Sequence, residues 1–344
     1  MRLIRETNFD FIGKRKWAFL ISGAVIVPGL ISILVRGGLR MGVDFTGGVE
    51  LQVEMVQKTG VAAAAPVEID GVRRAVAQAG FDDRNIQRLG GKDRTLFLIH
   101  VAGPKPSEAE AGGETEAAGS RATSDKIMGK LRDDFPGNDV ILRGTQNIGP
   151  KIGAELQSAA LQALLLSMLL IMVYVGWRFE PRFGIATIIA LFHDVVFCVG
   201  LFSLLNKEFT LNIVAALLTL AGYSVSDTIV VFDRIREELK LKQKRESYDL
   251  IFNHAINKTM SRTVLTSVTT LWAVIALFIF GGEVIHDFVW VLLVGIIVGT
   301  YSSIAVAAPL VIEWQHYIVK RQAAKAGGGT EPTRTTGVLA GSGH

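Results

Sequence analysis

The chain has 344 residues, 49% of them hydrophobic, and carries a formal net charge of +4. Its mean hydropathy is +0.37 and its charges are clustered, whereas a soluble protein spreads charge over its whole surface. This composition excludes an ordinary soluble domain and indicates an integral membrane protein.

The first apolar stretch, 17–35, follows a basic N-terminal segment and approaches the ~20 residues that a bilayer requires. A basic segment before an apolar run is also typical of a signal peptide. This run, however, is longer than the usual apolar region of a signal peptide, and no small-residue cleavage site follows it. We therefore expect residues 1–36 to form a cytoplasmic N-terminus and a retained first transmembrane helix.

Residues 37–155 form the largest hydrophilic part of the chain, and we expect them to fold outside the cytoplasm as one domain. Their pattern predicts the order β-α-β-β-α-β, which is typical of a small ferredoxin-like α+β domain. The Gly-, Glu- and Ala-rich segment 103–120 is predicted to be a mobile insertion without chemistry. The expected strands are 49–56, 85–90, 94–101 and 139–144, and the expected helices are 66–80 and one capped by Thr123 or Asp125 that ends near Leu131.

Residues 156–312 contain five further apolar stretches, which complete a predicted all-α membrane bundle of six helices. Lysine and arginine gather in the loops on one side of this bundle, so the positive-inside rule places both termini in the cytoplasm. Because the basic residues lie next to the membrane, they do not favour a nucleic-acid partner. Residues 313–344 are expected to form a disordered cytoplasmic tail. The five spans are 156–176, 183–205, 211–232, 259–280 and 288–312.

Asp227 is the only ionisable residue in the span 211–232. A carboxylate at membrane depth costs several kcal/mol unless it is paired, hydrated or used to carry protons. Arg262 lies three residues into the next span at a similar depth, ~5–8 Å inside the boundary, so the two side chains are expected to pair. Arg262 shares its helix face with three threonines, at 266, 269 and 270. The pair is either a static ion pair that fixes helix packing or a site that binds and releases protons.

His193 and Asp194 lie inside the span 183–205. Asp194 is a candidate second relay carboxylate or an acceptor that orients Arg262, while His193 is either a proton carrier or a hydrogen-bonded packing residue. Metal binding is not expected, because adjacent helical residues point to different faces. The single cysteine, Cys198, excludes an intramolecular disulfide. No phosphate-binding loop or nucleophile triad is present, so we predict neither an enzyme nor a cofactor.

Three segments carry recognisable motifs: GVDFTGG at 42–48, GYSVSDTIVVFDRIRE at 222–237 and SRTVLTSVTT at 261–270. Together they resemble the SecF branch of the SecD/SecF family, within the resistance, nodulation and division (RND) superfamily. The stretches VYVGWRFEPRFG and IALFHD agree as well, and the resemblance covers nearly the whole chain. Two departures are Ser226, where many members have asparagine, and the insertion 103–120.

The resemblance implies a half-transporter of the bacterial inner membrane that works with SecD, beside the SecYEG channel and YajC, and within membrane lipid. It implies that the proton motive force, or a sodium gradient in some members, helps to move a preprotein outward after the ATP-driven step. Asp227 then accepts the proton, Arg262 faces it, and Asp194 and His193 are further relay candidates. Structural linkage is assigned to Asp44, Phe45, Thr46, Gly47 and Gly48, with Asp44 as a local helix cap.

Two other classes of function stay open at this point. Half of a small-molecule or lipid exporter would share the relay but would need a large, aromatic-lined external pocket. A scaffold that only holds a translocation complex together would need no titrating carboxylate. Replacement of Asp227 by asparagine would leave such a scaffold intact.

Overall fold

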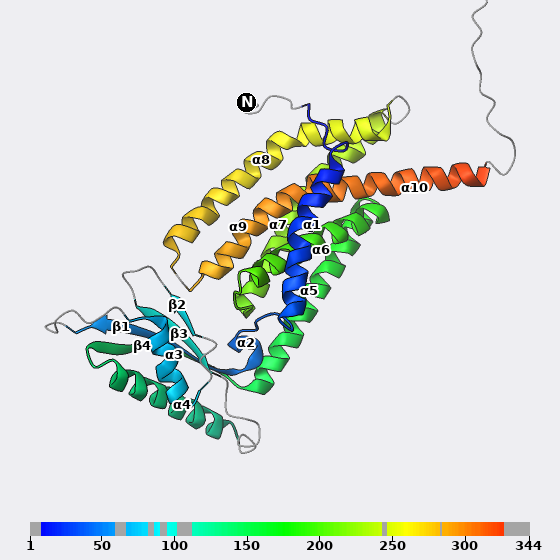
Figure 1. Cartoon of the computed structure of the whole chain (residues 1–344). Helices are drawn as coiled ribbons and strands as arrows, with labels where there is room; N and C mark the ends of the chain where they lie inside the picture. Colours follow the sequence, from blue (N-terminus) through cyan, green and yellow to red (C-terminus); the bar gives the residue numbers. More distant parts are fainter. Residues whose placement is uncertain are drawn as a thin grey trace, which may run out of the picture.

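The protein is a bundle of long helices with a small α/β domain at one end, which we call the domain end; the opposite end is the distal end (Figure 1). The computed structural model describes residues 8–58, 67–81, 86–89, 95–101, 112–242, 246–282 and 284–326. In these ranges, six helices are long and apolar enough to cross a membrane, as predicted. They are α1 (Arg15–Val35), α5 (Pro150–Arg178), α6 (Pro181–Leu204), α7 (Leu211–Lys242), α8 (Tyr248–Phe280) and α9 (His286–Ser302), which continues through a π-helical turn (Ser303–Ala307) into α10 (Ala308–Ala326).

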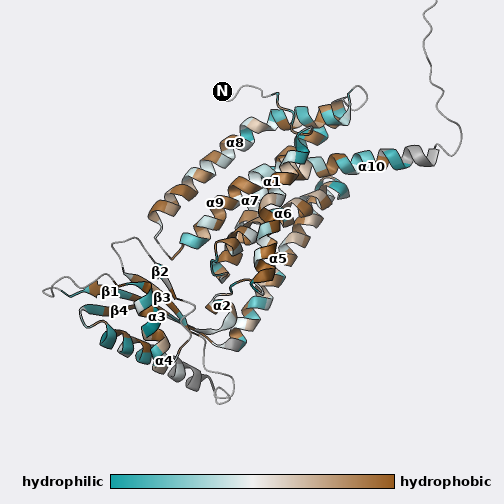
Figure 2. Cartoon of the chain, in the orientation of Figure 1, coloured by the Kyte–Doolittle hydropathy of each residue, from teal (hydrophilic) through white to brown (hydrophobic). Residues whose placement is uncertain are grey.

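Several helices extend beyond the predicted apolar spans. Helix α7 continues to Lys242 instead of ending near 232, because arginine, glutamate, lysine and leucine, all good helix formers, follow the apolar run. Helix α10 reaches Ala326, so the predicted disordered tail is helical up to this residue, while 327–344 lie outside the described residues. The coloured part of α10 that projects beyond the bundle and the start of α8 are more hydrophilic than the central parts of the bundle (Figure 2).

Glu238 connects α7 to α8 at the distal end. Its side chain is 1% exposed, and its Oε1 lies 2.7 Å from both Arg234 Nη2 and Lys258 Nζ. A buried carboxylate is retained where basic groups compensate its lost hydration. Because Arg234 belongs to α7 itself, it is the ion pair with Lys258 that fixes the two helices to each other beyond their apolar segments.

The α/β domain confirms the predicted β-α-β-β-α-β order. Its four antiparallel strands are arranged β2-β3-β1-β4, and α3 and α4 cover the sheet face that points away from the bundle (Figure 1). Alternate residues of β1, such as Leu51 and Val53, are buried against Ile127 and Leu131 of α4. The elements are β1 (Gly48–Gln57), α3 (Ile69–Gln78), β2 (Ile86–Leu89), β3 (Leu96–Val101), α4 (Gly112–Asp134) and β4 (Asn138–Ile148).

Helix α4 begins earlier than predicted, at Gly112, so part of the predicted mobile insertion is helical. Thr123 does not cap this helix, since its Oγ1 donates to the carbonyl of Gly119 at 3.0 Å, one turn earlier in the same helix. The glutamates and alanines of this segment have high helix propensity, which accounts for the earlier start. Residues 103–111 lie outside the described part of the chain.

Candidate functional site

Asp227 lies in the apolar part of α7 and contacts two neighbouring helices. Its side chain is buried, with 9% exposed. Thr263 of α8 donates a hydrogen bond to Oδ1, and Ser303, where the π-helical turn begins, donates one to Oδ2, both at 2.8 Å. A hydroxyl group can donate to an ionised carboxylate or accept from a protonated one. The site therefore accommodates both protonation states of Asp227.

The predicted ion pair between Asp227 and Arg262 does not form. No nitrogen of Arg262 lies within 4.0 Å of the Asp227 carboxylate, whose hydrogen-bond partners are the two hydroxyls. Arg262 directly precedes Thr263, and successive helical residues point about 100° apart. Because Thr263 faces Asp227, the Arg262 side chain is turned away and is exposed, lining a pocket of about 470 Å³ between α5, α7 and α8.

The predicted threonine face of α8 is also not the one that contacts Asp227. Thr266 and Thr269 are exposed, and their hydroxyls donate to carbonyls of their own helix. A different α8 residue, Ser267, accepts a hydrogen bond from Tyr223 of α7 at 3.0 Å and lies 2.7 Å from the hydroxyl of Thr300 on α9. The polar contacts between these helices therefore follow Thr263 and Ser267, one turn apart.

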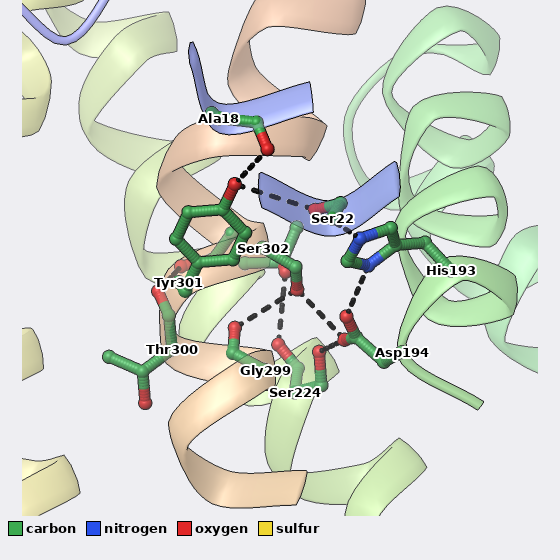
Figure 3. Close-up of polar contacts among 11 residues, drawn as sticks. Ala18, Ser22, His193, Asp194, Ser224, Gly299, Thr300, Tyr301 and Ser302 are labelled. Atoms are coloured by element: carbon green, nitrogen blue, oxygen red, sulfur yellow. Dashed lines mark hydrogen bonds and ion pairs between the residues drawn. The ribbon is translucent and has the colours of Figure 1, made fainter. Parts of the chain in front are cut away.

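Asp194 of α6 is fully buried and is held by three polar side chains (Figure 3). Ser224 of α7 and Ser302 of α9 donate to its Oδ2 at 2.6 and 2.8 Å, and His193 Nδ1 lies 3.0 Å from its Oδ1. Arg262 is not a partner in the part of the chain described, so the prediction that Asp194 orients Arg262 is wrong. Asp194 instead joins three helices of the bundle.

His193 connects Asp194 to α1. The two adjacent side chains do not diverge as expected, because the imidazole ring folds back onto the carboxylate of Asp194. Its Nε2 lies 2.8 Å from the hydroxyl of Ser22. Ser22 donates to the Tyr301 hydroxyl at 3.4 Å, which in turn donates to the carbonyl of Ala18 at 2.5 Å (Figure 3). A continuous set of polar groups thus runs from the centre of the bundle to α1.

Several of these contact residues were missed in the sequence. Each is a hydroxyl residue in an apolar span, and the adjacent serines in TYSSIAV at the end of α9 were the available signal. The sequence alone does not show which hydroxyl faces which carboxylate, because that depends on the rotation of each helix about its own axis. The residues missed are Ser22, Thr263, Tyr301, Ser302 and Ser303.

The predicted linkage residues 44–48 form a packed joint between the bundle and the α/β domain. Val43–Thr46 form a short helix, α2, and Gly47 and Gly48 follow with φ of 70° and 131°, values that favour glycine. Asp44 is not a cap of its own helix: its Oδ2 accepts from the backbone N–H of Leu211, the first residue of α7, at 2.7 Å. Its other oxygen accepts from Gln146 of β4 at 3.0 Å.

Glu50 of β1 and His100 of β3 are cross-strand neighbours beside this joint. Burial lowers the pKa of His100, which is 4% exposed, while the nearby Glu208 acts in the opposite direction. Burial also raises the pKa of its cross-strand neighbour Glu50, an effect that Glu208 and Asp44 increase. Both shifts follow from the removal of a charged group from water, and both favour neutral side chains at the joint.

Comparison with known proteins decides the family. The family profile "Protein export membrane protein SecD/SecF, C-terminal" matches residues 131–317, and the profile "SecD/SecF GG Motif" matches 31–59. The chain is 40% identical to the protein translocase subunit SecF of Calditerrivibrio nitroreducens, over 92% of this chain and 95% of that protein. The chain belongs to the SecD/SecF family. The matched GG segment contains Gly47 and Gly48 of the joint.

Other SecD/SecF relatives agree. The chain is 41% identical to SecF of Magnetococcus marinus, over 90% of this chain and 93% of that protein. The crystal structure of SecDF from Thermus thermophilus, described as a translocon-associated membrane protein, matches with a TM-score of 0.74 and 33% identity, over 90% of this chain but only 39% of the SecDF chain. The six apolar helices and the family identify a multi-pass membrane protein with an RND-like bundle, whose named relatives have a transport role.

Proposed function

We propose that this chain couples the proton motive force to outward preprotein translocation, with Asp227 as the group that binds and releases the proton. The supporting observation is that Asp227 is buried between two neutral hydroxyl groups, with Arg262 outside ion-pair distance. A static packing interaction would use the neighbouring arginine. An arrangement that stabilises both the ionised and the protonated carboxyl is instead suited to repeated proton binding.

The proposed orientation places the α/β domain outside and the distal end in the cytoplasm of a bacterial inner membrane. The start of α1 and the end of α10 lie at the distal end (Figure 1). Basic residues gather at this end, as the positive-inside rule requires of a cytoplasmic side. They include Arg178, Arg182, Arg234, Arg236 and Lys240.

The proposed partner is a SecD subunit that packs on α7. Ala215, Thr219, Gly222 and Ser226 lie along one exposed stripe in the apolar part of α7, and Arg262 of α8 is exposed as well. Small residues at this spacing let another helix approach closely. The matched SecDF chain has more than twice the length that this chain covers, which leaves room for a second half. SecYEG, YajC and the preprotein are the further proposed partners, after the ATP-driven step.

The proposed coupling passes through the joint. Neutralisation of Asp227 weakens its attraction to Thr263 of α8 and to the more distant guanidinium of Arg262, so α7 can shift relative to α8. Because Asp44 binds the first N–H of α7, such a shift is transmitted to α2 and β1. One charge that crosses 100 mV releases about 2.3 kcal/mol, so several protons suffice for a domain movement.

The test compares Asp227→Asn with Asp233→Asn in inverted membrane vesicles or proteoliposomes that contain SecYEG and SecD. Asp233 lies on the same helix but is exposed, and it provides the matched control. We expect Asp227→Asn to abolish gradient-stimulated export while blots and co-purification show normal assembly, with Asp233→Asn close to wild type. Normal export by Asp227→Asn would overturn the proposal in favour of a scaffold. Repeating the assay with a sodium gradient and no pH gradient distinguishes the two coupling ions.

A further inference from the structure

Two adjacent serines of the sixth spanning helix bind two different carboxylates. Ser302 donates to Asp194 Oδ2 and Ser303 donates to Asp227 Oδ2, both at 2.8 Å. Successive residues on a helix point about 100° apart, so one peptide unit presents a hydroxyl to each carboxylate. Asp194 and Asp227 are therefore linked through a single short segment of backbone.

Each serine also has a second acceptor on its own helix. The hydroxyl of Ser302 lies 3.1 Å from the carbonyl oxygen of Gly299, and that of Ser303 lies 3.0 Å from the carbonyl oxygen of Thr300. A serine carries one hydroxyl hydrogen. It donates this hydrogen to the carboxylate when the carboxylate is ionised. When the carboxyl group is protonated and donates instead, the serine hydrogen can turn to the backbone carbonyl.

The helix changes its geometry at this point. The π-helical turn Ser303–Ala307 begins at the second serine, and single π-helical turns within α-helices occur frequently at functional sites. The carbonyls of Gly299 and Thr300, which can accept from the serines, lie in the helical turn that precedes it. A Cβ on Gly299 would be 3.1 Å from the Cβ of Ser224, which itself donates to Asp194. A change in the hydrogen bonds of this turn therefore acts directly on the contact between α9 and α7.

We propose that Ser302 and Ser303 are positioning residues that couple the protonation state of Asp194 to that of Asp227 through the π-helical turn. Protonation of one carboxyl group turns its serine to the backbone, which alters the position of the adjacent serine and so the binding of a proton at the other carboxyl group. This inference rests on the proposed function of Asp227 as a proton site. It adds Asp194 as a second, coupled site.

The titratable and charged groups around the pair come from several helices. His193 and Cys198 lie near Asp194 on α6, while Arg262 acts on Asp227 from α8. Tyr223 of α7 and Tyr301 of α9 belong to the surrounding hydroxyl groups. Helix α1 contributes the hydroxyl of Ser22 and the carbonyl of Ala18. These groups stay unchanged in the serine variants, which therefore isolate the contribution of the two hydroxyls.

The experiment follows the infrared carbonyl band of protonated Asp227 against pH in purified, membrane-reconstituted protein, with the band assigned by its loss in Asp227→Asn. In Ser303→Ala the ionised carboxylate of Asp227 loses a hydroxyl donor, so its protonated form becomes more favourable. We therefore expect Asp227 to be half-protonated at a proton concentration about tenfold lower than in the wild type. Ser303→Thr should restore the wild-type midpoint. Ser167, whose hydroxyl donates, among the residues described, only to the carbonyl of Leu164 on α5, provides the control Ser167→Ala, which should leave the midpoint unchanged.

The decisive variant is Ser302→Ala, since Ser302 binds Asp194 and does not bind Asp227. If the two carboxyl groups are coupled, Ser302→Ala and Asp194→Asn should each change the proton concentration at half-protonation of Asp227 at least threefold. Adding Ser302→Ala to the Asp194→Asn variant should then cause no further change. An unchanged Asp227 midpoint in both variants would overturn the proposal. If either alanine variant fails to fold, Ser302→Cys and Ser303→Cys replace it, because a thiol keeps the size but donates weakly. The titration requires no translocation, so its failure is distinguishable from loss of the proposed export function.

Discussion

Asp44 caps the first turn of α7 from a separate part of the chain, because its Oδ2 accepts a hydrogen bond from the backbone N–H of Leu211 at 2.7 Å. The first N–H groups of a helix have no partner within the helix, and an aspartate is among the best acceptors for them. In this protein the cap has a second consequence. It fixes the start of the helix that carries Asp227 to the segment that leads into the α/β domain.

Removal of this cap should destabilise the joint. We expect Asp44→Ala to lower the free energy of unfolding by about 1 kcal/mol and to reduce gradient-stimulated export. Asp44→Asn keeps an oxygen acceptor and should retain most of the stability. Thermal unfolding of the purified protein, followed by intrinsic fluorescence, measures the stability of both variants, and the vesicle assay measures their export. Equal stability of the alanine variant and the wild type would show that the hydrogen bond to Leu211 contributes nothing.

The joint should not tolerate a side chain at Gly153 of α5. A Cβ at this position would lie 2.8 Å from the backbone carbonyl oxygen of Phe45, and such overpacking typically costs about 1–3 kcal/mol. We therefore expect Gly153→Ala to lower the melting temperature. The matched control is Gly129→Ala on α4, where the new Cβ meets no heavy atom within 4 Å. There the substitution should be neutral or stabilising by up to about 1 kcal/mol.

Two threonines of α8 should differ sharply when replaced by valine, which has nearly the same shape. Thr263→Val removes a donor to Asp227, whereas Thr266→Val removes only a bond to a carbonyl of its own helix. We expect Thr263→Val to reduce gradient-stimulated export about fivefold, the effect of roughly 1 kcal/mol, and Thr266→Val to leave it near wild type. Vesicle export assays at matched protein levels measure the difference between the two variants. If the threonine face at 266–270 formed the relay, Thr266→Val would reduce export as well, and the difference would disappear.

The stability of the α/β domain should depend on His100 at mildly acidic pH. Burial lowers the pKa of His100 in the folded state below the value of 6.5 expected for the unfolded chain. The stability is therefore fully present above about pH 6.5 and decreases as the pH falls from there towards the lowered pKa, since the unfolded chain binds the proton first. His100→Gln should flatten the decline in melting temperature between about pH 7 and pH 5. His286→Gln, at a side chain that is 41% exposed, is the control and should keep the wild-type slope.

The bundle and the α/β domain were predictable because their signals are local. Apolar runs near the bilayer length predict spanning helices, and alternation in residues such as Leu51 and Val53 predicts a strand with one buried face. Asp227 was found for the same reason, since a lone carboxylate in an apolar run needs no knowledge of its neighbours. Its role as a proton site stays a prediction.

The contacts of the site could not be predicted, since they depend on how the helices rotate and pack. Arg262 and Thr263 are adjacent, and only the packing of α8 on α7 determines which of them meets Asp227. The same limit applies to Asp44, whose partner Leu211 is 167 residues away in the sequence. The early start of α4 was missed for another reason: a segment rich in glycine, glutamate and alanine has a composition that suits both a mobile loop and a helix.

The ion pair between Glu238 and Lys258 gives α7 the geometry of a lever. It holds α7 to α8 at the distal end, so a tilt of α7 pivots there. At a rise of 1.5 Å per residue, Asp227 lies about 16 Å from this pivot and Leu211 lies about 40 Å from it. A displacement of the helix at the level of Asp227 is thereby enlarged about two and a half times where α7 meets Asp44. Under the proposed coupling, small adjustments around Asp227 therefore produce larger movements of the α/β domain.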